Sequence, residues 1–415
     1  MRCILKYKTV LIVVIIVFLL NIFGCSKKQE SKKEEKSKLN FYINIDDEYS
    51  LKEVNFIINE FQNANKNVDV KFEGGIGDRK LVNNEENSIE KSDIIFASRN
   101  KMIDMKKKGL LANLSDKYDE NNIKERYYNI IGAYGRIGEE YYGIGLMPYS
   151  IEFLYNKDAL RKLNISFPSN VNEWIKILNI CKDNGVQVPV VINKEIEIEN
   201  VVGSIIINSN VNMENITEMY DSGLNQYSKV INMQRAFNII YEFVRNGYFN
   251  NSIFRNGDEN DIDRFLKGEI PLIIASSYYH NKFNESNIGI IKEYTNSNNT
   301  FTHNIPVIVD PLLCVSEKNS NSIEVNNFIK FVLSDEFQNK LVNLGYITGN
   351  KKANREFTSL NNIIVEHINN ASSSSILFIY NMPKKITKNI ASAIAEILKG
   401  RYTGKEWYEI LKNTY

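Results

Sequence analysis

Cysteine is scarce in this chain of 415 residues, and its scarcity excludes a disulfide framework. Of the four cysteines, Cys3 and Cys25 lie in the N-terminal segment. Cys181 stands in a helical pattern and Cys314 in an apolar strand pattern, so we expect two separate buried thiols rather than a bridge.

Histidine is scarcer still, and the motifs that mark common enzyme classes are missing. His280, His303 and His367 are isolated, and none stands in an HxH or HExxH spacing, so a zinc site has no support and we expect satisfied polar or surface histidines. A dinucleotide fingerprint counted from Gly75 fails, because Lys80 stands where the third glycine belongs. No GxSxG nucleophile elbow is present. We therefore predict no cofactor, no metal and no catalytic residue.

An excess of charge of one sign is also absent. The 51 Lys and Arg residues balance 50 Asp and Glu residues, which excludes a strongly basic nucleic-acid-binding protein. Hydrophobic residues make up 43% of the chain, which excludes a disordered protein. The length suggests two or three compact units.

The N-terminal segment contains an uninterrupted apolar run at Val10–Leu20, preceded by Arg2, Lys6 and Lys8. A membrane-spanning helix needs roughly 20 apolar residues, so this run is too short to be one. A positively charged start followed by a short apolar stretch is typical of a secretory signal peptide. We predict a signal peptide over residues 1–24.

The end of this segment, Ile22-Phe23-Gly24-Cys25, resembles the lipobox of bacterial lipoproteins. The resemblance implies cleavage before Cys25, lipidation of Cys25 and anchoring at the extracellular face of the cell membrane. Ser26–Lys38 contains no apolar residue and cannot form a core. Residues 25–38 are therefore predicted to be the lipidated cysteine and a charged, solvated tether.

From residue 39 onward, short apolar strands alternate with amphipathic helices, which is the pattern of an α/β fold. Ser50 and Glu53 have the spacing of a capping box, which predicts that a helix opens at Ser50. Strand patterns occur at 39–45, 68–72, 93–97, 151–155, 188–192 and 270–275. Helical patterns occur at 100–108, 157 onward, 171–184, 233–246, 261–267, 322–333, 337–344, 386–399 and 404–412.

Five strings, in order along the chain, resemble the family 1 extracellular solute-binding proteins of bacterial ABC importers, the maltose-binding-protein-like family. The strongest is Tyr141–Leu160, YYGIGLMPYSIEFLYNKDAL, which is similar to the family's YGLP and LYYNKDLF segment. The others are Ser92–Ala97 with Lys108–Ser115, Asp263–Ser277, Asn326–Leu344 and Ala393–Leu411. Together they extend over nearly all of residues 39–412.

The resemblance implies a two-lobed α/β fold of the type II periplasmic-binding-protein kind, with hinge strands and a central ligand cleft. Lobe one would comprise residues 39–148 and 305–340, and lobe two residues 149–304 and 341–415. The hinges would lie near Pro148-Tyr149-Ser150 and near Asn304-Ile305-Pro306.

The function implied is binding rather than catalysis. A monomer would capture a small solute, above all a sugar or oligosaccharide, and deliver it to the permease subunits of an ABC importer. The membrane would be a partner through the N-terminal lipid, and nucleic acid would not be a partner.

Matching positions to the family places the ligand-binding residues in loops after strands and at the crossing between the lobes. The same loops also contain Arg99, Ser150, Ser276, Tyr279 and Asn381. The expected ligand-binding residues are Asp46, Asp47, Glu48, Ser98, Asn100, Tyr149, Glu152, Ser277, Tyr278 and Tyr380.

Sugar-binding members of the family often stack the sugar on tryptophan, but this chain has only Trp174 and Trp407, both in helical patterns away from the predicted cleft. Tyrosine, with 23 residues, would have to supply the stacking surface.

Three alternatives stay open at this point. The acidic turn at Asp46, Asp47 and Glu48 leaves room for a cationic solute, such as a polyamine or an amino sugar. The same fold would also suit a surface lipoprotein for sensing or protein interaction. A surface glycan hydrolase would use Asp46 or Glu152.

Overall fold

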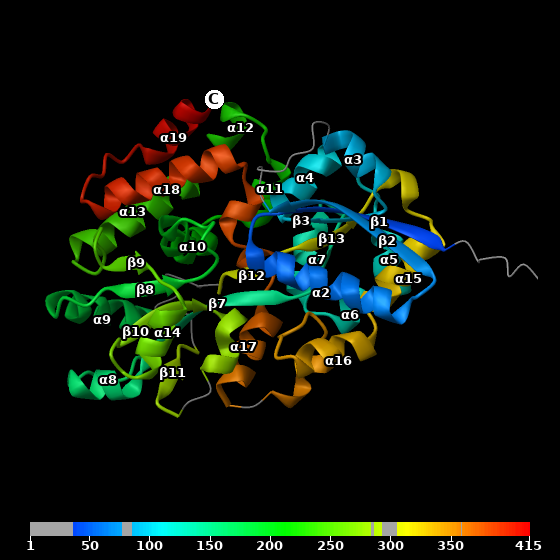
Figure 1. Ribbon diagram of the computed structural model, residues 1–415. Coiled ribbons are helices and arrows are strands. Elements are labelled where there is room, and N and C mark those ends of the chain that lie inside the picture. The colour runs from blue at the N-terminus through cyan, green and yellow to red at the C-terminus, as the bar shows by residue number, and fades with distance from the viewer. Residues whose placement is uncertain (1–35, 77–84, 284–285, 293–304, 358) are drawn as a thin grey trace, which may run out of the picture. The chain divides into compact units, whose positions relative to one another are not determined.

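Two mixed β-sheets, each covered by helices, organise the chain, as a computed structural model shows (Figure 1). The structure describes residues 36–76, 85–283, 286–292, 305–357 and 359–415. Residues 38–415 form one compact unit, to which everything below refers. The predicted signal peptide, Cys25, most of the tether, Gly77, Lys80, His303 and Asn304 lie outside the described residues.

The first sheet has the strand order β2-β1-β3-β13-β6. β1 and β3 run parallel, with Phe41 opposite Ile94 and Asn44 opposite Ala97, whereas β13 runs antiparallel to both β3 and β6. All four residues of β3 are buried, as expected for a central strand covered on both faces. The strands are β1 (Ser37–Ile45), β2 (Val68–Ile76), β3 (Ile94–Ala97), β6 (Ile144–Gly145) and β13 (Leu312–Val315).

The second sheet has the order β11-β7-β10-β8-β9, and β12 also pairs with β7. β10 is antiparallel to β7 and parallel to β8, and β8 is parallel to β9. Its strands are β7 (Pro148–Asn156), β8 (Val188–Val191), β9 (Phe254–Asn256), β10 (Leu272–Ser276), β11 (Ile288–Ile290) and β12 (Val307–Val309). β4 (Arg136–Ile137) and β5 (Glu140–Tyr141) form a separate two-stranded ribbon.

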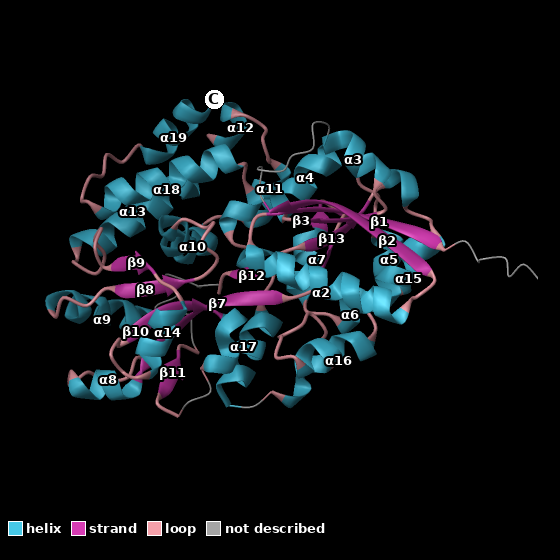
Figure 2. Cartoon of the chain, viewed as in Figure 1, coloured by secondary structure: helices cyan, strands magenta, loops and turns pink. Residues whose placement is uncertain are grey.

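Helices flank both sheets (Figure 2). Those from the first part of the chain are α2 (Glu48–Ala64), α3 (Glu85–Lys91), α4 (Arg99–Lys107), α5 (Ser115–Glu120), α6 (Ile123–Arg126) and α7 (Asn129–Gly135). The middle part contributes α8 (Lys157–Lys162), α9 (Val171–Asp183), α10 (Ile198–Asn210), α11 (Met213–Glu218), α12 (Leu224–Tyr227), α13 (Ile231–Arg245), α14 (Glu259–Leu266) and the 3₁₀ helix η2 (Ser277–Lys282). The last part contributes η3 (Glu317–Asn319), α15 (Ile323–Val332), α16 (Asp335–Asn343), η4 (Ala353–Glu356), α17 (Ser359–Asn370), η5 (Ser373–Ser375), η6 (Phe378–Asn381), α18 (Lys384–Leu398) and α19 (Glu406–Thr414).

The start of α2 differs from the sequence prediction. Asp47 is the N-cap, because its side chain accepts hydrogen bonds from the backbone N–H groups of Tyr49 and Ser50, both at 2.9 Å. The predicted capping box at Ser50 and Glu53 is therefore wrong, and both residues lie inside the helix. The Ser50 hydroxyl donates to the Asp47 carboxylate at 2.7 Å, which strengthens the cap that is formed.

The helix that precedes β8 of the second sheet, α9, begins as predicted. Asn170 caps α9 by accepting a hydrogen bond from the backbone of Glu173 at 3.0 Å. Trp174 on α9 is buried against the ring of Phe153 on β7, and its indole N–H donates to the Leu154 carbonyl at 3.1 Å. The prediction that Trp174 is a structural residue is confirmed.

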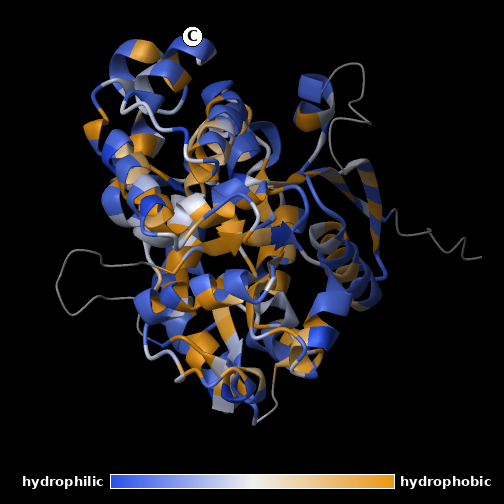
Figure 3. Cartoon of the chain, turned by 90° about the vertical axis from the view of Figure 1, so that its left-hand side faces the viewer, coloured by the Kyte–Doolittle hydropathy of each residue, from blue (hydrophilic) through white to orange (hydrophobic). Residues whose placement is uncertain are grey.

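The core is apolar and continuous across the described residues. Strands carry hydrophobic residues in the interior, whereas the outward faces of the helices are hydrophilic (Figure 3). Cys181 and Cys314 are both buried and free, so the prediction of two separate thiols is confirmed. Within the described part of the chain, no helix is both long enough and apolar enough to cross a membrane.

β7 pairs with three other strands of the second sheet. Its first residues pair with β12, with Tyr149 opposite Ile308, and its later residues pair with β10 and β11. All nine of its residues are buried. The predicted strand at 151–155 extends back to Pro148 because the residues from Pro148 to Ser150 pair with β12. The predicted first hinge therefore lies inside a paired strand.

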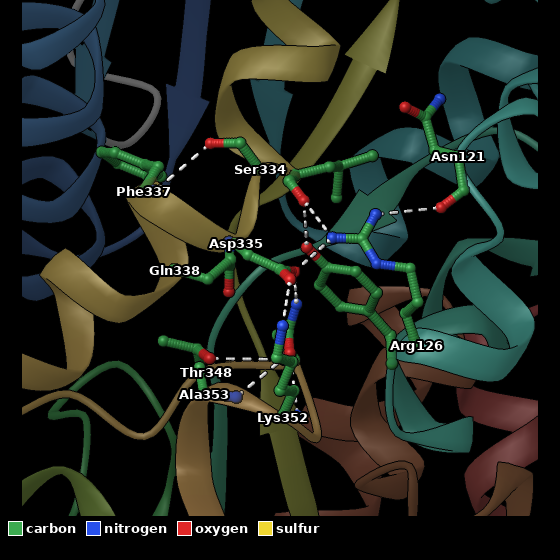
Figure 4. A network of polar contacts seen from close by, with 12 residues as sticks. Asn121, Arg126, Ser334, Asp335, Phe337, Gln338, Thr348, Lys352 and Ala353 are labelled. Atoms are coloured by element: carbon green, nitrogen blue, oxygen red, sulfur yellow. Dashed lines mark hydrogen bonds and ion pairs between the residues drawn. The ribbon is translucent and has the colours of Figure 1, made fainter.

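The segment after α16 packs against elements of the first sheet. Asp335 at the start of α16 pairs with Arg126 at 2.7 Å and with Lys352 at 3.0 Å (Figure 4). An isolated bridge between Tyr127 and Asn350 continues this contact. From the sequence, lobe two is predicted to resume at residue 341. Residues 348–354, which follow that boundary, nevertheless contact the first part of the chain.

Candidate functional site

Two parallel strands of the first sheet end at the same edge, and polar residues follow both. Because Asn44 on β1 lies opposite Ala97 on β3, the residues that follow, Asp46 and Ser98, emerge side by side. Lys101 on α4 reaches back across this edge, and its ammonium lies 2.8 Å from Asp46 Oδ1. The carboxylate of Asp46 at this edge is therefore paired with a cation.

A cavity of about 690 Å³ opens at this edge. One side comes from the ends of β1 and β3 and from α3 and α4, and the other from the loop after β8, Tyr220 and the start of α18. Its polar and charged lining residues are Asn44, Asp46, Glu85, Ser98, Asn100, Lys101, Asp104, Lys107, Lys108, Asn193, Glu195, Glu197, Tyr220, Asp221, Tyr380, Lys384, Lys385 and Thr387. We call this cavity the cleft.

Charges in the cleft largely compensate one another. Besides the pair of Lys101 with Asp46, Lys385 pairs with Asp221 at 3.0 Å. Glu85 accepts a hydrogen bond from the Asn44 amide at 2.7 Å. The result is a wall rich in hydrogen-bond donors and acceptors, which suits a polar, hydroxyl-bearing molecule.

A second, smaller cavity of about 40 Å³ lies beside the cleft and is lined mainly by tyrosines and carboxyl groups. Asn193 lines both cavities. The small cavity is lined by Asp47, Tyr49, Ser50, Glu53, Tyr149, Ile192, Asn193, Ser276, Tyr278, Tyr279, Ile308 and Asp310. We call it the tyrosine pocket.

The rings of the tyrosine pocket contact one another. The ring centroid of Tyr278 lies 4.7 Å from that of Tyr49, 5.6 Å from that of Tyr149 and 5.1 Å from that of Tyr279. The Tyr49 and Tyr279 hydroxyls lie 2.9 Å apart. Tyr49 comes from α2, Tyr149 from β7 and the other two from η2, so three distant segments build this pocket.

Two buried carboxyl groups face the tyrosine pocket. Glu53 accepts a hydrogen bond from the Tyr149 hydroxyl, and Asp310 follows β12. Burial raises the pKa of Glu53 well above its ordinary value, although the Tyr149 hydrogen bond acts in the opposite direction. Burial, with the charges of Asp47 and Asp46, also raises the pKa of Asp310.

The expected ligand-binding residues are distributed over both cavities and beyond them. Asp46, Ser98, Asn100 and Tyr380 line the cleft, and Asp47, Tyr149 and Tyr278 line the tyrosine pocket. Glu48, Glu152 and Ser277 line neither of the two. The structure therefore brings seven of the ten residues to two adjoining cavities.

Several of these side chains also have partners within the protein. The amide of Asn100 donates to the carbonyls of Ile379 and Met382, at 2.9 and 3.0 Å, and so holds η6 against α4. The neighbouring Arg99 is buried and donates to Asn381 Oδ1 at 3.0 Å.

The residues outside both cavities are engaged elsewhere. Glu152 is fully buried and lies 3.0 Å from His367 Nδ1 on α17. Ser277 Oγ accepts a hydrogen bond from the Ser150 backbone N–H at 2.9 Å. Glu48 is exposed at the first position of α2. His367 is thus a buried histidine with a hydrogen-bond partner, as is His280, whose Nε2 lies 2.7 Å from the Gly345 carbonyl oxygen.

Sequence reasoning missed Tyr49, Glu53, Asn193 and Asp310. Asn193 could have been predicted from the sequence, because it directly follows the predicted strand 188–192. Ligands of α/β folds bind at the loops that follow parallel strands. Glu53 was predicted to belong to a capping box, so it was not considered as a residue of the site. Neither tryptophan lines the two cavities, and among the described residues no cluster of His, Cys, Asp and Glu has the geometry to hold a metal ion.

Comparison with known proteins gives a consistent result. The sequence profile of the family described as bacterial extracellular solute-binding protein matches residues 50–339. No curated protein matches the chain significantly in sequence.

Solved structures share the fold at low identity. A probable secreted solute-binding lipoprotein from Streptomyces coelicolor is 12% identical, with a TM-score of 0.67, over 91% of this chain and 98% of the other. An ABC transporter solute-binding protein from Thermotoga lettingae bound with α-D-tagatose is 14% identical, with a TM-score of 0.63, over 91% and 98%. An extracellular solute-binding protein from Staphylococcus aureus in complex with maltose is 13% identical, with a TM-score of 0.61, over 91% and 96%.

These likenesses identify the fold as the two-lobed, type II periplasmic-binding-protein-like fold, as expected from the sequence. The family consists of solute-binding proteins of transporters rather than enzymes, so the hydrolase alternative loses its basis. Since the family profile extends over more than half of the chain, the protein belongs to the bacterial extracellular solute-binding protein family of ABC importers.

Proposed function

We propose that the protein is a lipid-anchored extracellular receptor that captures a sugar or oligosaccharide in the cleft and delivers it to the permease of an ABC importer. The observation that carries the proposal is the cleft itself, about 690 Å³ in volume and lined by hydrogen-bonding side chains from elements of both sheets. Cavities of roughly 300–1,000 Å³ are typical for small-molecule ligands. The maltose and tagatose complexes among the structural neighbours support a sugar.

Within the cleft, we assign the sugar contacts to residues at the first-sheet edge and at η6. Asp46 and Ser98 offer polar atoms at the ends of β1 and β3, and Asn100 also lines the cleft, with its Oδ1 buried and without a hydrogen-bond partner among the described residues. Tyr380 and Tyr220 line the opposite part of the cleft and would supply stacking surfaces in place of tryptophan. This assignment leaves Glu48, Glu152 and Ser277 without a direct contact to the sugar.

The proposed motion is closure of two lobes about strands β7 and β12. We keep lobe one as residues 39–148 with 305–340 and lobe two as 149–304 with 341–415, with hinges near Pro148-Tyr149-Ser150 and near 304–306, except that the segment at 348–354, which contacts Asp335 and Tyr127, is assigned to lobe one. Solute bound between the lobes would favour the closed state, which the permease would recognise.

The proposed anchor is a lipid on Cys25, followed by the tether at 25–38. A lipid and a flexible tether keep the receptor close to the permease and raise its effective concentration there. The partners are then the solute, the permease subunits and the membrane.

A direct test of the function is titration of the purified full chain, in detergent, with maltose, galactose, tagatose and maltotriose in an isothermal calorimeter. Native mass spectrometry of the same preparation would detect a solute that co-purifies. Ser98→Ala and Tyr380→Leu should weaken sugar binding, whereas Ser228→Ala, at an exposed turn after α12, should not. Absence of any sugar binding would contradict the proposal.

A separate test concerns the anchor. Replacing Cys25 by Ala should move the protein from the membrane fraction to the medium and abolish incorporation of a labelled fatty acid. An unchanged membrane fraction in Cys25→Ala would overturn the lipid anchor and leave sugar binding unaffected.

A further inference from the structure

The tyrosine pocket holds polar atoms that the protein itself does not satisfy. Among the described residues, Glu53 Oε2 and Asp310 Oδ1 are buried and have no hydrogen-bond partner. Glu53 is 2% exposed and Asp310 is 6% exposed. Both residues line the pocket. A buried polar atom without a partner is costly, so two such oxygens at one cavity indicate a place for a donor.

The pocket is lined by the carboxyl groups of Glu53 and Asp310, whose raised pKa values reflect burial without a cation beside them, so a bound ammonium would favour their ionised forms. Three carboxyl-bearing residues, Asp47, Glu53 and Asp310, line it, and no Lys or Arg appears in its lining within the described residues. Three cations lie near it: Lys101 is paired with Asp46, Lys282 is paired with Glu259 and lies 6.0 Å from the Tyr279 ring centroid, and the Lys52 ammonium lies 5.9 Å from the Tyr49 ring centroid. An anion is therefore excluded. A neutral hydroxyl would donate one hydrogen bond and leave the second unpaired carboxyl oxygen without a partner, whereas an ammonium has three donors.

The tyrosine rings supply the second feature that a cation requires. Tyr49, Tyr149, Tyr278 and Tyr279 surround the pocket, with Tyr278 contacting each of the other three. Aromatic faces attract a cation within about 6 Å of the ring centroid, and the attraction increases when water is excluded. Aromatic rings combined with free carboxylate oxygens form a site for an ammonium group rather than for a hydroxyl.

We propose that the solute carries a protonated amino group and that the tyrosine pocket binds this group, with Glu53 Oε2 and Asp310 Oδ1 as its hydrogen-bond acceptors. This inference rests on the function proposed above and narrows its substrate class. The remainder of the solute occupies the cleft.

The sizes and connection of the two cavities agree with this division. A volume of about 40 Å³ is close to that of one or two water molecules, so the pocket admits an ammonium and an adjoining carbon but not a sugar ring. Asn193 lines both cavities, so the two adjoin at this residue, and the proposal places one molecule across it. Two classes of solute have the required ammonium: amino sugars with a free amine, and polyamines.

The central comparison of the test is between oligosaccharides that carry a free amine and the same oligosaccharides with that amine acetylated, which removes its charge. Calorimetric titration of the purified full chain, in detergent, would use glucosamine oligosaccharides of two to four units, their N-acetylated counterparts, the neutral maltose series and spermidine. The free-amine oligosaccharides should bind at least about tenfold more tightly than the N-acetylated ones. Tight binding of spermidine alone would support the ammonium site, assign the solute to the polyamines and overturn the sugar as the solute of the proposed function.

Variants locate the effect. Glu53→Gln and Asp310→Asn preserve the shape of each side chain and remove its charge, so each should lower the affinity ratio of free amine to N-acetyl about tenfold. The matched controls are Glu409→Gln on α19 and Asp263→Asn on α14, both exposed and outside the two cavities. Thermal unfolding of each variant shows whether it is folded. If a pocket variant does not fold, the ratio in the unmodified protein decides.

The failure of this inference differs from the failure of the proposed function. Equal binding of free-amine and N-acetylated ligands, or an unchanged ratio in both pocket variants, would overturn the ammonium site while sugar binding stands. Absence of binding across the sugars, amino sugars and spermidine would overturn the proposed function together with the inference.

Discussion

The Tyr49 hydroxyl on α2 lies 2.9 Å from the Tyr279 hydroxyl in η2, so one hydrogen bond joins a helix of the first sheet to the segment that follows β10 of the second. The two residues are far apart in sequence, and both line the tyrosine pocket. A contact of this kind exists only when α2 and η2 are close together, so the proposed closure of the lobes predicts that it belongs to the closed state.

Removal of this hydrogen bond should weaken solute binding without unfolding the protein. A neutral hydrogen bond contributes about 0.5–1.5 kcal/mol, so Tyr49→Phe and Tyr279→Phe should each lower affinity by about 2–12-fold. The double variant should be no weaker than either single one, because both variants lose the same bond. Tyr408→Phe, at an exposed position on α19, is the control. Calorimetry measures the effect, and additive losses would contradict the assignment.

Arg99 should be essential for stability. Its guanidinium is 2% exposed and donates to the carbonyl oxygens of Ala133 and Tyr134 and to Asn381 Oδ1, so it joins α4 to α7 and η6. Burial lowers its pKa to about 10, which leaves it charged at neutral pH.

Arg99→Met removes these charged hydrogen bonds and leaves their acceptors unpaired, which should lower the free energy of unfolding by at least about 2 kcal/mol. Arg161→Met, on the exposed face of α8, should change it by less than about 0.5 kcal/mol. Urea unfolding followed by circular dichroism compares the two, and equal losses would rule out the structural role of Arg99.

The buried pair of Glu152 and His367 should make stability depend on pH near neutrality. Burial alone lowers the pKa of His367, but the charge of Glu152 and the hydrogen bond at 3.0 Å outweigh it, so the pKa is raised. A raised pKa in the folded state adds stability that is complete below the ordinary value of about 6.5 and is lost as pH rises through the folded value.

The unfolding midpoint in urea should therefore fall between about pH 6 and pH 8 in the unmodified protein, and fall less in Glu152→Gln. Groups that titrate in both proteins cancel in the difference. Parallel pH profiles for the two proteins would refute the coupling.

Asp335 should show the opposite dependence at acid pH. Hydrogen bonds from Lys352 and Arg126 lower its pKa to about 2 (Figure 4). A lowered pKa adds stability that is present above the ordinary value of about 4 and is lost as pH falls through the folded value.

Asp335→Asn should consequently lower the unfolding midpoint at pH 6, and its difference from the unmodified protein should shrink between about pH 4 and pH 2. Asp119→Asn, whose partner Lys124 is exposed, is the control. A difference that stays constant to pH 2 would show that Asp335 acts through shape rather than charge.

The sequence predicted the strands and helices well where the pattern was local. The Asn170 cap of α9 depends on a few consecutive residues, and it formed as expected. The cap of α2 was misplaced because Asp47 and Ser50 both suit an N-cap, and only the structure shows that the Asp47 carboxylate receives the backbone N–H groups.

The site was predicted in part, for a physical reason. Asp46 and Ser98 could be found because parallel strands end at one edge. The tyrosine pocket could not be found, because Tyr49, Tyr149, Tyr278 and Asp310 come together only through the packing of α2, β7, η2 and the end of β12. A local sequence pattern does not show which distant segments of the chain pack together.

The strand order of the first sheet constrains the order of folding during synthesis. β13 lies between β3 and β6, yet its residues follow all the strands of the second sheet in the chain. The ribosome therefore releases β6 long before its neighbour β13 exists, and the first sheet stays incomplete until Val315 has been made. The part of the protein that is synthesised first is the part whose sheet is completed last.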